Sequence, residues 1–453
     1  MTSPAIPFVA SSSYPVRAGN RVRPLIDGEP AFRRICQAIE MARESVQVTV
    51  TFMWAAFEMP DGRGSTLDVL DRAAARGVDV RLVFWRPDAE TERHRRNAFW
   101  GSAAHVGLLE ARRSAVKIRW DRAHPGFCQH QKSWLIDAGA DGETAFVGGI
   151  NLNPHSMVAP GHHGEGHNHD VYVELAGPST VDVHHNFVQR WNEASERLAP
   201  DGRWGAGSET DLPFPTRIPA PCGGATVQVQ RTIHAGRYCD GTAAPGGHAF
   251  DVARGERSVF DQYRAAIDAA RRSIYIENQY LDVPDIVDCL HRALERGVDV
   301  VLLMPAEPDV TLPVSPERRA VLDSRARLGA FANFMLAGLA GLGADRRRKP
   351  VYVHDKLMLI DDAWATVGSC NLHRYSLFGN GEMNVSFAEP DTVRALRCEL
   401  LHEHLGRDTA GLDDRAALEL FRRIAKENRT KRDAEDPAWQ GLAFELDAAT
   451  HVG

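Results

Sequence analysis

Hydrophobic and polar positions along the chain follow two alternating periods. Stretches with apolar residues at every third or fourth position predict amphipathic helices, and each is followed by a short apolar run rich in β-branched residues that predicts a buried strand. The segment 38–54 (AIEMARESVQVTVTFMW) is the end of such a helix running into a strand, and 266–282 (AIDAARRSIYIENQYLD) has the same form. Helices that alternate with apolar strands predict an α/β sandwich.

This pattern of helices and strands occurs twice along the chain, which indicates an internal repeat. Blocks of the first part match blocks of the second in the same order: 38–54 with 266–282, 75–85 with 295–305, 130–137 with 354–361, and 147–152 with 367–372. Residues 198–225 are rich in Gly and Pro and show no period, as in a linker. We therefore predict an α/β protein with an N-terminal half (1–200), a linker (201–225) and a C-terminal half (226–453) that ends in an amphipathic helix and a charged tail.

The longest apolar run extends from Leu328 to Ala344 and contains Asn333 and several glycines. It is short for a membrane span, so we expect a helix beneath a cleft. The first residues contain no basic segment followed by an apolar core, so no secretory signal is predicted. We expect a monomer that is cytoplasmic or bound peripherally to a membrane, and outward delivery by a route other than Sec stays open.

Charge and cysteine content narrow the class of protein. The formal net charge of −7 argues against a general electrostatic grip on nucleic acid, so we expect no stable nucleic acid partner and only local anion binding. The 7 cysteines are scattered and form no CxxC pair. They predict neither a disulfide framework nor a cysteine zinc site, and they suit reduced thiols.

The candidate chemistry begins with a histidine and a lysine two positions apart in each half: His130 with Lys132, and His354 with Lys356. Residues two apart on a strand share a face, so each pair is expected to point at a common target. Lysine supplies positive charge, and histidine can act as nucleophile or general acid near neutral pH. Two such pairs suit a double displacement, in which one imidazole attacks phosphorus and the other protonates the leaving alcohol.

Small and amide residues follow each histidine–lysine pair. Asn151 and Asn371 are expected to donate amide hydrogens to an anion. The residues just before them are small enough to let the backbone approach a phosphate: Gly148, Gly149, Gly368 and Ser369. Phosphoryl transfer requires such stabilisation of its oxygens, so we predict an anion site that contains a nucleophile.

Four carboxylates are candidates for the site. Asp137 and Asp361 lie seven positions after their histidines and would face the opposite side of a continuing strand. We keep both as catalytic candidates but favour a structural role. Asp170 and Glu382 lie at matching places further downstream, and we predict that these two hold the imidazoles in one tautomer.

The motif HxKxxxxD followed by GG or GS and Asn, present twice, resembles the phospholipase D superfamily. The second copy fits closely, whereas the first has a few additional residues between Asp137 and Gly148; segments 274–281 (IYIENQYL) and 185–194 (HNFVQRWNEA) resemble phospholipase D proper. The resemblance implies two pseudo-symmetric α/β sandwich halves around one shared active site, without metal or other cofactor. It also implies that His130 is the nucleophile and His354 the acid/base, and that a carboxylate beyond each motif binds the histidine of that motif.

Three further stretches have two readings each. Glu277, Asn278 and Gln279 interrupt an apolar strand and are expected either to line the substrate cleft or to stabilise the strand end. The run DRRRKP (345–350) suits either an anionic lipid surface or a solvated charge run. A histidine-rich loop matches no fixed metal spacing, so we expect a solvated loop beside the substrate rather than a zinc or nickel site: His155, His162, His163, His167 and His169.

The function expected from these motifs is hydrolysis of a glycerophospholipid phosphodiester to phosphatidate and a head-group alcohol. Transphosphatidylation through a phosphohistidine would accompany it, with phospholipid at a membrane surface as substrate. The alternatives are a phosphatidyltransferase of the cardiolipin-synthase kind, a nuclease of the same superfamily, and a non-enzymatic lipid-binding module. The intact double motif argues against the last of these.

Overall fold

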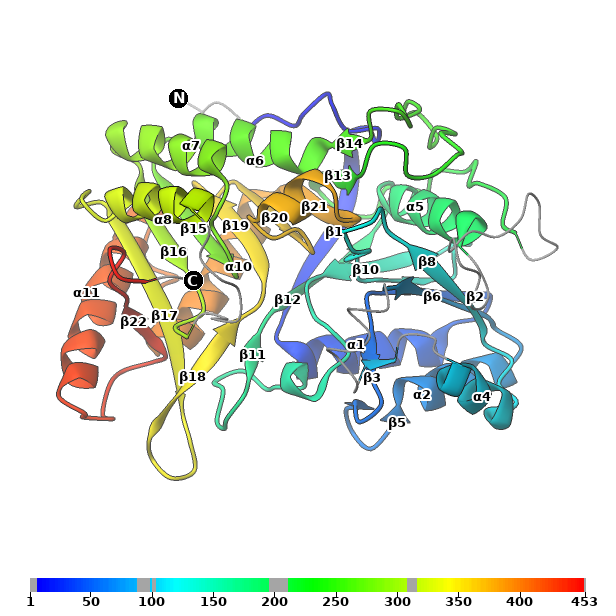
Figure 1. Ribbon diagram of the computed structural model, residues 1–453, viewed down its shortest axis with the longest axis horizontal. Helices are drawn as coiled ribbons and strands as arrows, with labels where there is room; N and C mark the ends of the chain where they lie inside the picture. Colours follow the sequence, from blue (N-terminus) through cyan, green and yellow to red (C-terminus); the bar gives the residue numbers. More distant parts are fainter. Residues whose placement is uncertain (1–5, 88–97, 100–102, 195–210, 308–315, 452–453) are drawn as a thin grey trace.

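The first β-sheet of the protein is built by the N-terminal half. The computed structural model describes residues 6–87, 98–99, 103–194, 211–307 and 316–451 (Figure 1). Neighbouring strands in this sheet follow the order β8 (Lys117–Arg122), β6 (Asp79–Arg86), β2 (Ser45–Val50), β9 (Ser133–Ile136), β10 (Thr144–Gly148), β12 (Val171–Ala176) and β1 (Arg17–Ile26). The pairs among β8, β6 and β2 are parallel and the remaining pairs are antiparallel.

The second sheet repeats this order and these directions. Its strands are β17 (Phe334–Leu342), β16 (Asp299–Leu303), β15 (Ser273–Asn278), β19 (Lys356–Ile360), β20 (Trp364–Gly368), β21 (Glu382–Ala388) and β13 (Ala225–Ile233). Again the first three are parallel and the rest antiparallel. The expectation of an α/β fold with two pseudo-symmetric halves is therefore confirmed.

One strand joins the two sheets. Residues Arg21–Ile26 of β1 pair with β12 of the first sheet, while Arg17 and Asn20 of the same strand pair with Val227 and Ala225 of β13 in the second. The register shifts between Arg17 and Asn20, so the strand bends as it passes from one sheet to the other. The two sheets thus share a hydrogen-bonded strand as well as a hydrophobic core.

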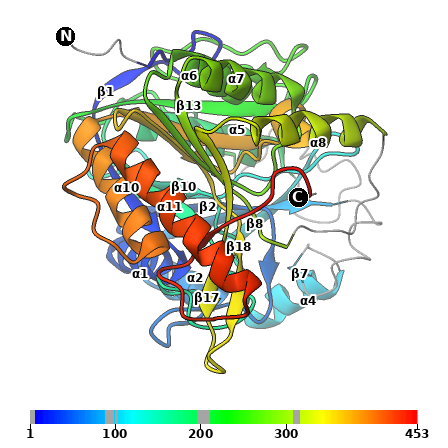
Figure 2. The same ribbon diagram turned by 90° about the vertical axis from the view of Figure 1, so that its left-hand side faces the viewer.

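Helices cover both sheets. Helices α1 (Gly28–Met41) and α2 (Thr66–Ala75) pack on the outer face of the first sheet, at the bottom of Figure 1, and α6 (Ser258–Ala269) and α7 (Pro284–Glu295) pack on the second, at the top. The central core lies between the sheets and includes Val147 and Val173 of one and Leu357 and Val385 of the other. Further helices border this core: α5 (Thr180–Glu193), α10 (Pro390–Leu405) and α11 (Asp414–Asp433), the last two in orange and red in Figure 2.

Shorter elements complete the chain. Strands β18 (Arg348–Val353) and β22 (Ala443–Glu445) both pair with β17, and β11 (Asn168–His169) pairs with β18. The small strands are β3 (Met53–Trp54), β4 (Glu58–Met59), β5 (Gly64–Ser65), β7 (Ala98–Phe99) and β14 (Glu256–Arg257). The remaining helices are α4 (Ala103–Arg112), α8 (Pro316–Leu328), α9 (Arg374–Phe378) and the 3₁₀ turn η1 (Pro154–Ser156).

The expected helix at Leu328–Ala344 is wrong. Leu328 ends helix α8, and Phe334–Leu342 forms strand β17, parallel to β16 and buried over nearly its whole length. A strand buried on both faces has a continuous apolar sequence, and this pattern alone does not distinguish it from a buried helix. No helix in the described part of the chain is long and apolar enough to cross a bilayer.

The predicted linker and N-terminus show how the halves are connected. Of residues 201–225, the first ten lie outside the described residues, and 211–222 contain neither helix nor strand. The N-terminal residues before β1 lie on the second half: Val9 N donates to Gln262 Oε1 at 3.1 Å, and Ser13 Oγ donates to Glu256 Oε2 at 2.7 Å. Residues 9–13 thus pack on the half that is last in sequence.

Candidate active site

The two histidine–lysine pairs lie at equivalent places in the two sheets. His130 and Lys132 come just before strand β9, and His354 comes just before β19, whose first residue is Lys356. The histidines therefore precede the strands rather than lying on them, which corrects the expectation of a shared strand face. The reason is that each histidine backbone bonds across to the other half instead of continuing the sheet.

His130 is held by residues of the C-terminal half. Its Nδ1 lies 3.1 Å from Glu382 Oε2 and 3.0 Å from the carbonyl oxygen of Ser369. The Ser369 hydroxyl in turn donates to Glu382 Oε2 at 2.6 Å. A proton on Nδ1 satisfies both acceptors, which leaves the Nε2 lone pair free, and Nε2 has no hydrogen-bond partner among the described residues.

His354 is held in the same way by residues of the N-terminal half. Its Nδ1 lies 2.5 Å from Asp170 Oδ2, and its Nε2 lies 3.2 Å from the side-chain amide of Asn151. The other oxygen of Asp170 accepts from the backbone N–H of Val171 at 2.9 Å, which fixes the carboxylate. Both predicted carboxylates therefore contact an active-site imidazole.

The carboxylates are exchanged between the halves, contrary to the expectation that each binds the histidine of its own motif. Backbone hydrogen bonds connect each histidine to the opposite half in the same way: His130 N donates to Gly381 O at 2.8 Å, and His354 N donates to His169 O at 2.9 Å. Gly381 directly precedes Glu382, and His169 directly precedes Asp170. Each histidine is thus bound, by backbone and side chain, to one short segment of the opposite half.

The two lysines are buried beside the histidines. Lys132 Nζ donates to the carbonyl of His130 at 2.7 Å and to Thr51 Oγ1 at 3.2 Å. Lys356 Nζ donates to the carbonyl of His354 and, at 2.7 Å, to Gln279 Oε1. Thr51 was not singled out from the sequence, although the matched blocks 38–54 and 266–282 put it at the position of Gln279.

Burial decides the protonation of these groups. It lowers the pKa of the Lys132 ammonium to about 7, against the attraction of Glu382. Burial and the neighbouring Lys356 lower the pKa of His354 to about 3, and burial lowers the pKa of His130 despite Glu382. In the free protein both imidazoles are therefore neutral, and Lys132 is partly deprotonated near neutral pH. A bound phosphodiester anion would favour the protonated form of Lys132, so the site suits a neutral nucleophile and an anionic substrate.

Gly149 and Ser369 lie against the carboxylates. A Cβ on Gly149 would come within 2.3 Å of Asp170 Oδ1, so this position requires glycine for Asp170 to reach His354. At the equivalent place in the other half, Ser369 donates its hydroxyl to Glu382. Asn371 is buried, and its Oδ1 has no hydrogen-bond partner among the described residues.

Asp137 and Asp361 take part in turns away from the histidines. Asp137 Oδ1 accepts from the backbone N–H groups of residues 43–45 at 2.7–3.2 Å. Asp361 accepts from the backbone N–H groups of residues 271–273 at 2.8–2.9 Å. Both aspartates adopt positive φ, 54° and 56°, where the chain turns out of the strand. These contacts agree with the structural role that the sequence analysis favoured for both aspartates.

The residues of the interrupted strand separate into three roles. Gln279 binds Lys356 through its oxygen and, through its amide, the Tyr352 hydroxyl at 3.1 Å. Asn278 Oδ1 accepts from the backbone of Leu372 at 3.0 Å and so holds the loop that follows β20. Glu277 is fully buried below the site and does not line a cleft.

A cleft of about 400 Å³ adjoins the site at Tyr352. It is lined by polar side chains of the histidine-rich loop and of β18, including His155, Glu165, His167 and Lys349. Lys349 comes from the run DRRRKP and pairs with Glu165 Oε1 at 2.5 Å. The expectation of a solvated histidine loop is wrong for His162 and His169, because both are fully buried.

Comparison with known proteins agrees with this architecture. The family model described as "Cardiolipin synthase, PLD-like domain" matches residues 35–191 and 263–403, one segment from each half. The chain belongs to the phospholipase D superfamily. In this superfamily member, the two matched segments contain the two histidine–lysine pairs and both exchanged carboxylates.

Curated relatives of this phospholipase D superfamily chain include cardiolipin synthase A of Pseudomonas entomophila (strain L48), 28% identical over 378 residues, which are 82% of this chain and 66% of the relative. Cardiolipin synthase A of Pseudomonas aeruginosa (strain LESB58) is 26% identical over 395 residues, 83% of this chain and 66% of the relative. The chain spans about two thirds of the length of these relatives. Phosphatidylserine synthase of Haemophilus influenzae Rd KW20 has a TM-score of 0.53 at 13% identity, over 95% of this chain and 88% of the other, which shows a shared fold.

Proposed function

We propose that the protein is a phosphatidyltransferase that moves a phosphatidyl group from a glycerophospholipid to the hydroxyl group of a second lipid alcohol. The observation that carries the proposal is the pair of exchanged carboxylate–histidine contacts, His130 with Glu382 and His354 with Asp170, because it provides two oriented imidazoles in one site. The relatives named as cardiolipin synthases support transfer to a lipid alcohol over simple hydrolysis.

In the first step, His130 Nε2 attacks phosphorus, and the bond from phosphorus to the leaving alcohol breaks. His130 suits this role because its Nδ1 is occupied by Glu382 and Ser369 while its Nε2 is unobstructed. The leaving oxygen takes a proton from His354, whose imidazolium form is stabilised by Asp170. Lys132 and Lys356 stabilise the charge on the phosphoryl oxygens.

Binding of the substrate prepares His354 for this proton transfer. In the free protein, burial and the Lys356 ammonium keep the pKa of His354 low. A phosphodiester anion placed between the lysines offsets their charge, so the pKa of His354 rises when the substrate is bound. The site thus becomes competent as an acid only in the complex.

In the second step, neutral His354 removes the proton from the acceptor hydroxyl, and the acceptor oxygen attacks the phosphohistidine. The phosphorus–nitrogen bond breaks, and His130 is restored. The cleft beside Tyr352 is the place we assign to the acceptor, because Gln279 connects the Tyr352 hydroxyl directly to Lys356. The substrate and the acceptor would both be met at a membrane surface.

The test uses vesicles of phosphatidylglycerol in water enriched in ¹⁸O, with lipid products measured by mass spectrometry. Transfer predicts cardiolipin and glycerol without ¹⁸O in the lipid phosphate. Hydrolysis predicts phosphatidate that carries ¹⁸O, and this as the main product would contradict the proposal. His130→Asn should form neither product, whereas His291→Asn, a partly exposed histidine on α7, should behave as the wild type.

A further inference from the structure

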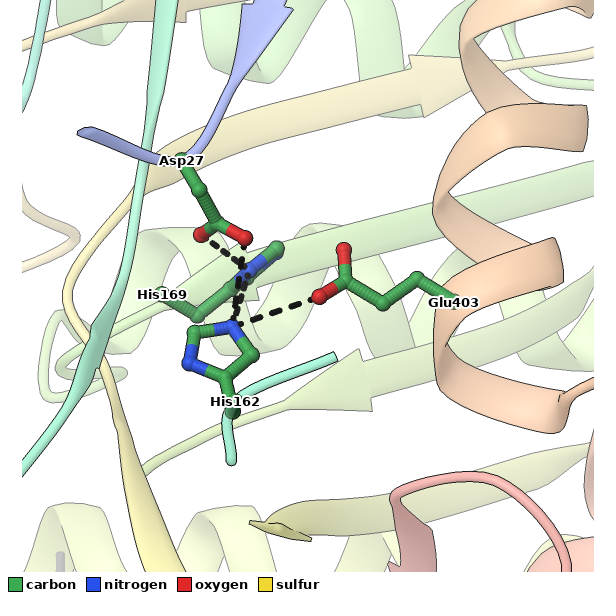
Figure 3. Close-up of side chains that lie close together, drawn as sticks. All are labelled: Asp27, His162, His169 and Glu403. Carbon is green, nitrogen blue, oxygen red and sulfur yellow. Dashed lines mark hydrogen bonds and ion pairs between the residues drawn. The ribbon is translucent and has the colours of Figure 1, made fainter. Parts of the chain in front are cut away.

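Behind the active site lies a buried group of histidines and carboxylates that the proposed reaction does not use. Figure 3 shows its members converging from three parts of the fold: Asp27 just after β1, His162 and His169 from the histidine-rich loop, and Glu403 from α10. Asp27, His162 and His169 have no exposed surface, and the Glu403 side chain is 7% exposed. Side chains of this charge are rarely buried together without a cation or a full set of hydrogen bonds.

The donor atoms of these residues are spaced like ligands of one ion. His162 Nε2 lies 3.3 Å from Asp27 Oδ2, 3.4 Å from Glu403 Oε1 and 3.3 Å from His169 Nδ1, which itself lies 3.0 Å from Asp27 Oδ1. One donor atom from each of the four residues can be chosen so that all lie within 4.8 Å of one another. Zinc bonds of 2.0–2.1 Å in a tetrahedron place neighbouring ligands about 3.3–3.4 Å apart.

Hydrogen bonds leave part of the group unsatisfied. Among the described residues, Asp27 Oδ2 has no hydrogen-bond partner although it is completely buried and points at His162. Two ring nitrogens, of His162 and His169, face each other and the same carboxylate. A cation bound by these nitrogen and oxygen atoms would use their lone pairs as ligands, and it would offset the negative charge of the two carboxylates.

The neighbours of His169 suit a ligand histidine. Glu277 Oε2 lies 3.0 Å from His169 Nε2, on the side of the ring away from Asp27. The two atoms are close but do not have the geometry of a hydrogen bond, and neither has another hydrogen-bond partner among the described residues. A carboxylate on this side still favours a proton on Nε2, which leaves the lone pair of Nδ1 for a metal, as around many zinc-bound histidines. Glu403 is also positioned independently, because its Oε1 accepts from the backbone N–H of Gly161 at 2.7 Å.

We propose that Asp27, His162, His169 and Glu403 bind one structural zinc ion that ties the two halves together beneath the active site. Three of the ligands belong to the N-terminal half and Glu403 to the C-terminal half. The site also adjoins the catalytic groups, since Asp27 N donates to the carbonyl of Asp170 at 2.8 Å and His169 directly precedes Asp170. A zinc ion here fixes the segment that orients His354.

The four proposed ligands could not be recognised as one site from the sequence, because they come from segments far apart along the chain. The spacing of the histidine loop alone fits no zinc motif, and Asp27 and Glu403 are far from it along the chain. The expectation from the sequence is a solvated histidine-rich loop that binds no zinc, so the proposal departs from that expectation for His162 and His169. A structural ion leaves the proposed reaction, which uses no metal, unchanged in kind.

The test is metal analysis of the untagged full-length chain, grown with zinc and purified without a metal-affinity step. Inductively coupled plasma mass spectrometry should find about one zinc per chain. His162→Ala and Glu403→Gln should lose most of this zinc; the second keeps an oxygen for the Gly161 N–H and so preserves the loop contact. His163→Ala, an exposed histidine of the same loop, is the matched control and should retain zinc.

Stability provides a second readout. Removal of zinc with a strong chelator during slow heating should lower the Tm of the wild type and of His163→Ala, and should leave Glu403→Gln almost unchanged. A wild-type chain with no stoichiometric metal would overturn the proposal and would assign the cluster to an imidazolium on His169 between Asp27 and Glu277. Zinc that persists in both ligand variants, or a stoichiometric metal other than zinc, would likewise overturn it.

Discussion

Replacing Lys132 by methionine should make the protein more stable at low pH while abolishing transfer. Lys132 is only 2% exposed, and burial lowers the pKa of its ammonium from 10.5 to about 7. The folded state therefore binds this proton less well than the unfolded state, and the charge destabilises the fold most at pH values below 7. This penalty disappears as the pH rises from about 7 toward the unfolded pKa of 10.5.

The size of the effect follows from the two pKa values. At 1.36 kcal/mol for each pKa unit, the free energy of unfolding of the wild type should gain about 2–3 kcal/mol relative to Lys132→Met between pH 6 and pH 9. Loss of the hydrogen bonds to Thr51 and His130 changes the free energy of unfolding of Lys132→Met by the same amount at pH 6 and at pH 9. The change between the two pH values therefore reports the charge alone.

The assay is urea unfolding of both proteins at several pH values, at equal ionic strength. Lys426→Met on helix α11 is the control, because this exposed ammonium stays in water in the folded and unfolded states. The stability of Lys132→Met relative to the wild type should fall by about 2–3 kcal/mol from pH 6 to pH 9. A relative stability that stays flat over this range, or that rises with pH, would refute the argument that burial dominates at Lys132.

Three other substitutions test the remaining contacts. Asp170→Asn should lower kcat about a hundredfold or more with little loss of stability, because the amide no longer stabilises a protonated His354. Asp361→Asn should do the reverse: it weakens three backbone hydrogen bonds and should lower the free energy of unfolding by about 1–3 kcal/mol in urea, while kcat stays within twofold. Gly149→Ala should reduce transfer by about tenfold or more, since its Cβ displaces Asp170, whereas Gly107→Ala, with open space around it, should be active. An unchanged kcat for Asp170→Asn or Gly149→Ala, or a lost kcat for Asp361→Asn, would contradict these assignments.

The duplicated blocks were enough to predict the fold. Each block fell on equivalent elements of the two sheets. Asp137 and Asp361 do lie in turns away from the histidines, but the strand-parity argument for this rested on a wrong premise, because both histidines precede their strands. The prediction at Leu328–Ala344 failed because a strand with both faces buried has no polar alternation to distinguish it from a helix.

What the sequence did not contain was the pairing of the two halves. The exchange of Asp170 and Glu382 depends on which segment of one half faces which histidine of the other, and local patterns carry no such information. For the same reason Thr51 could be found only by aligning the repeats, and Asp27 and Glu403 could not be connected with the histidine loop before the chain was folded.

Strand β1 determines how the two halves respond to proteolysis and to unfolding. It hydrogen-bonds to β12 and β13 at once, and the residues before it contact the second half, so the covalent connection through 211–222 is not what keeps the halves together. A protease that cuts within 211–222 would leave a nicked but assembled molecule. The chain should accordingly melt in one cooperative transition, because neither half can retain its sheet edge once the other has unfolded.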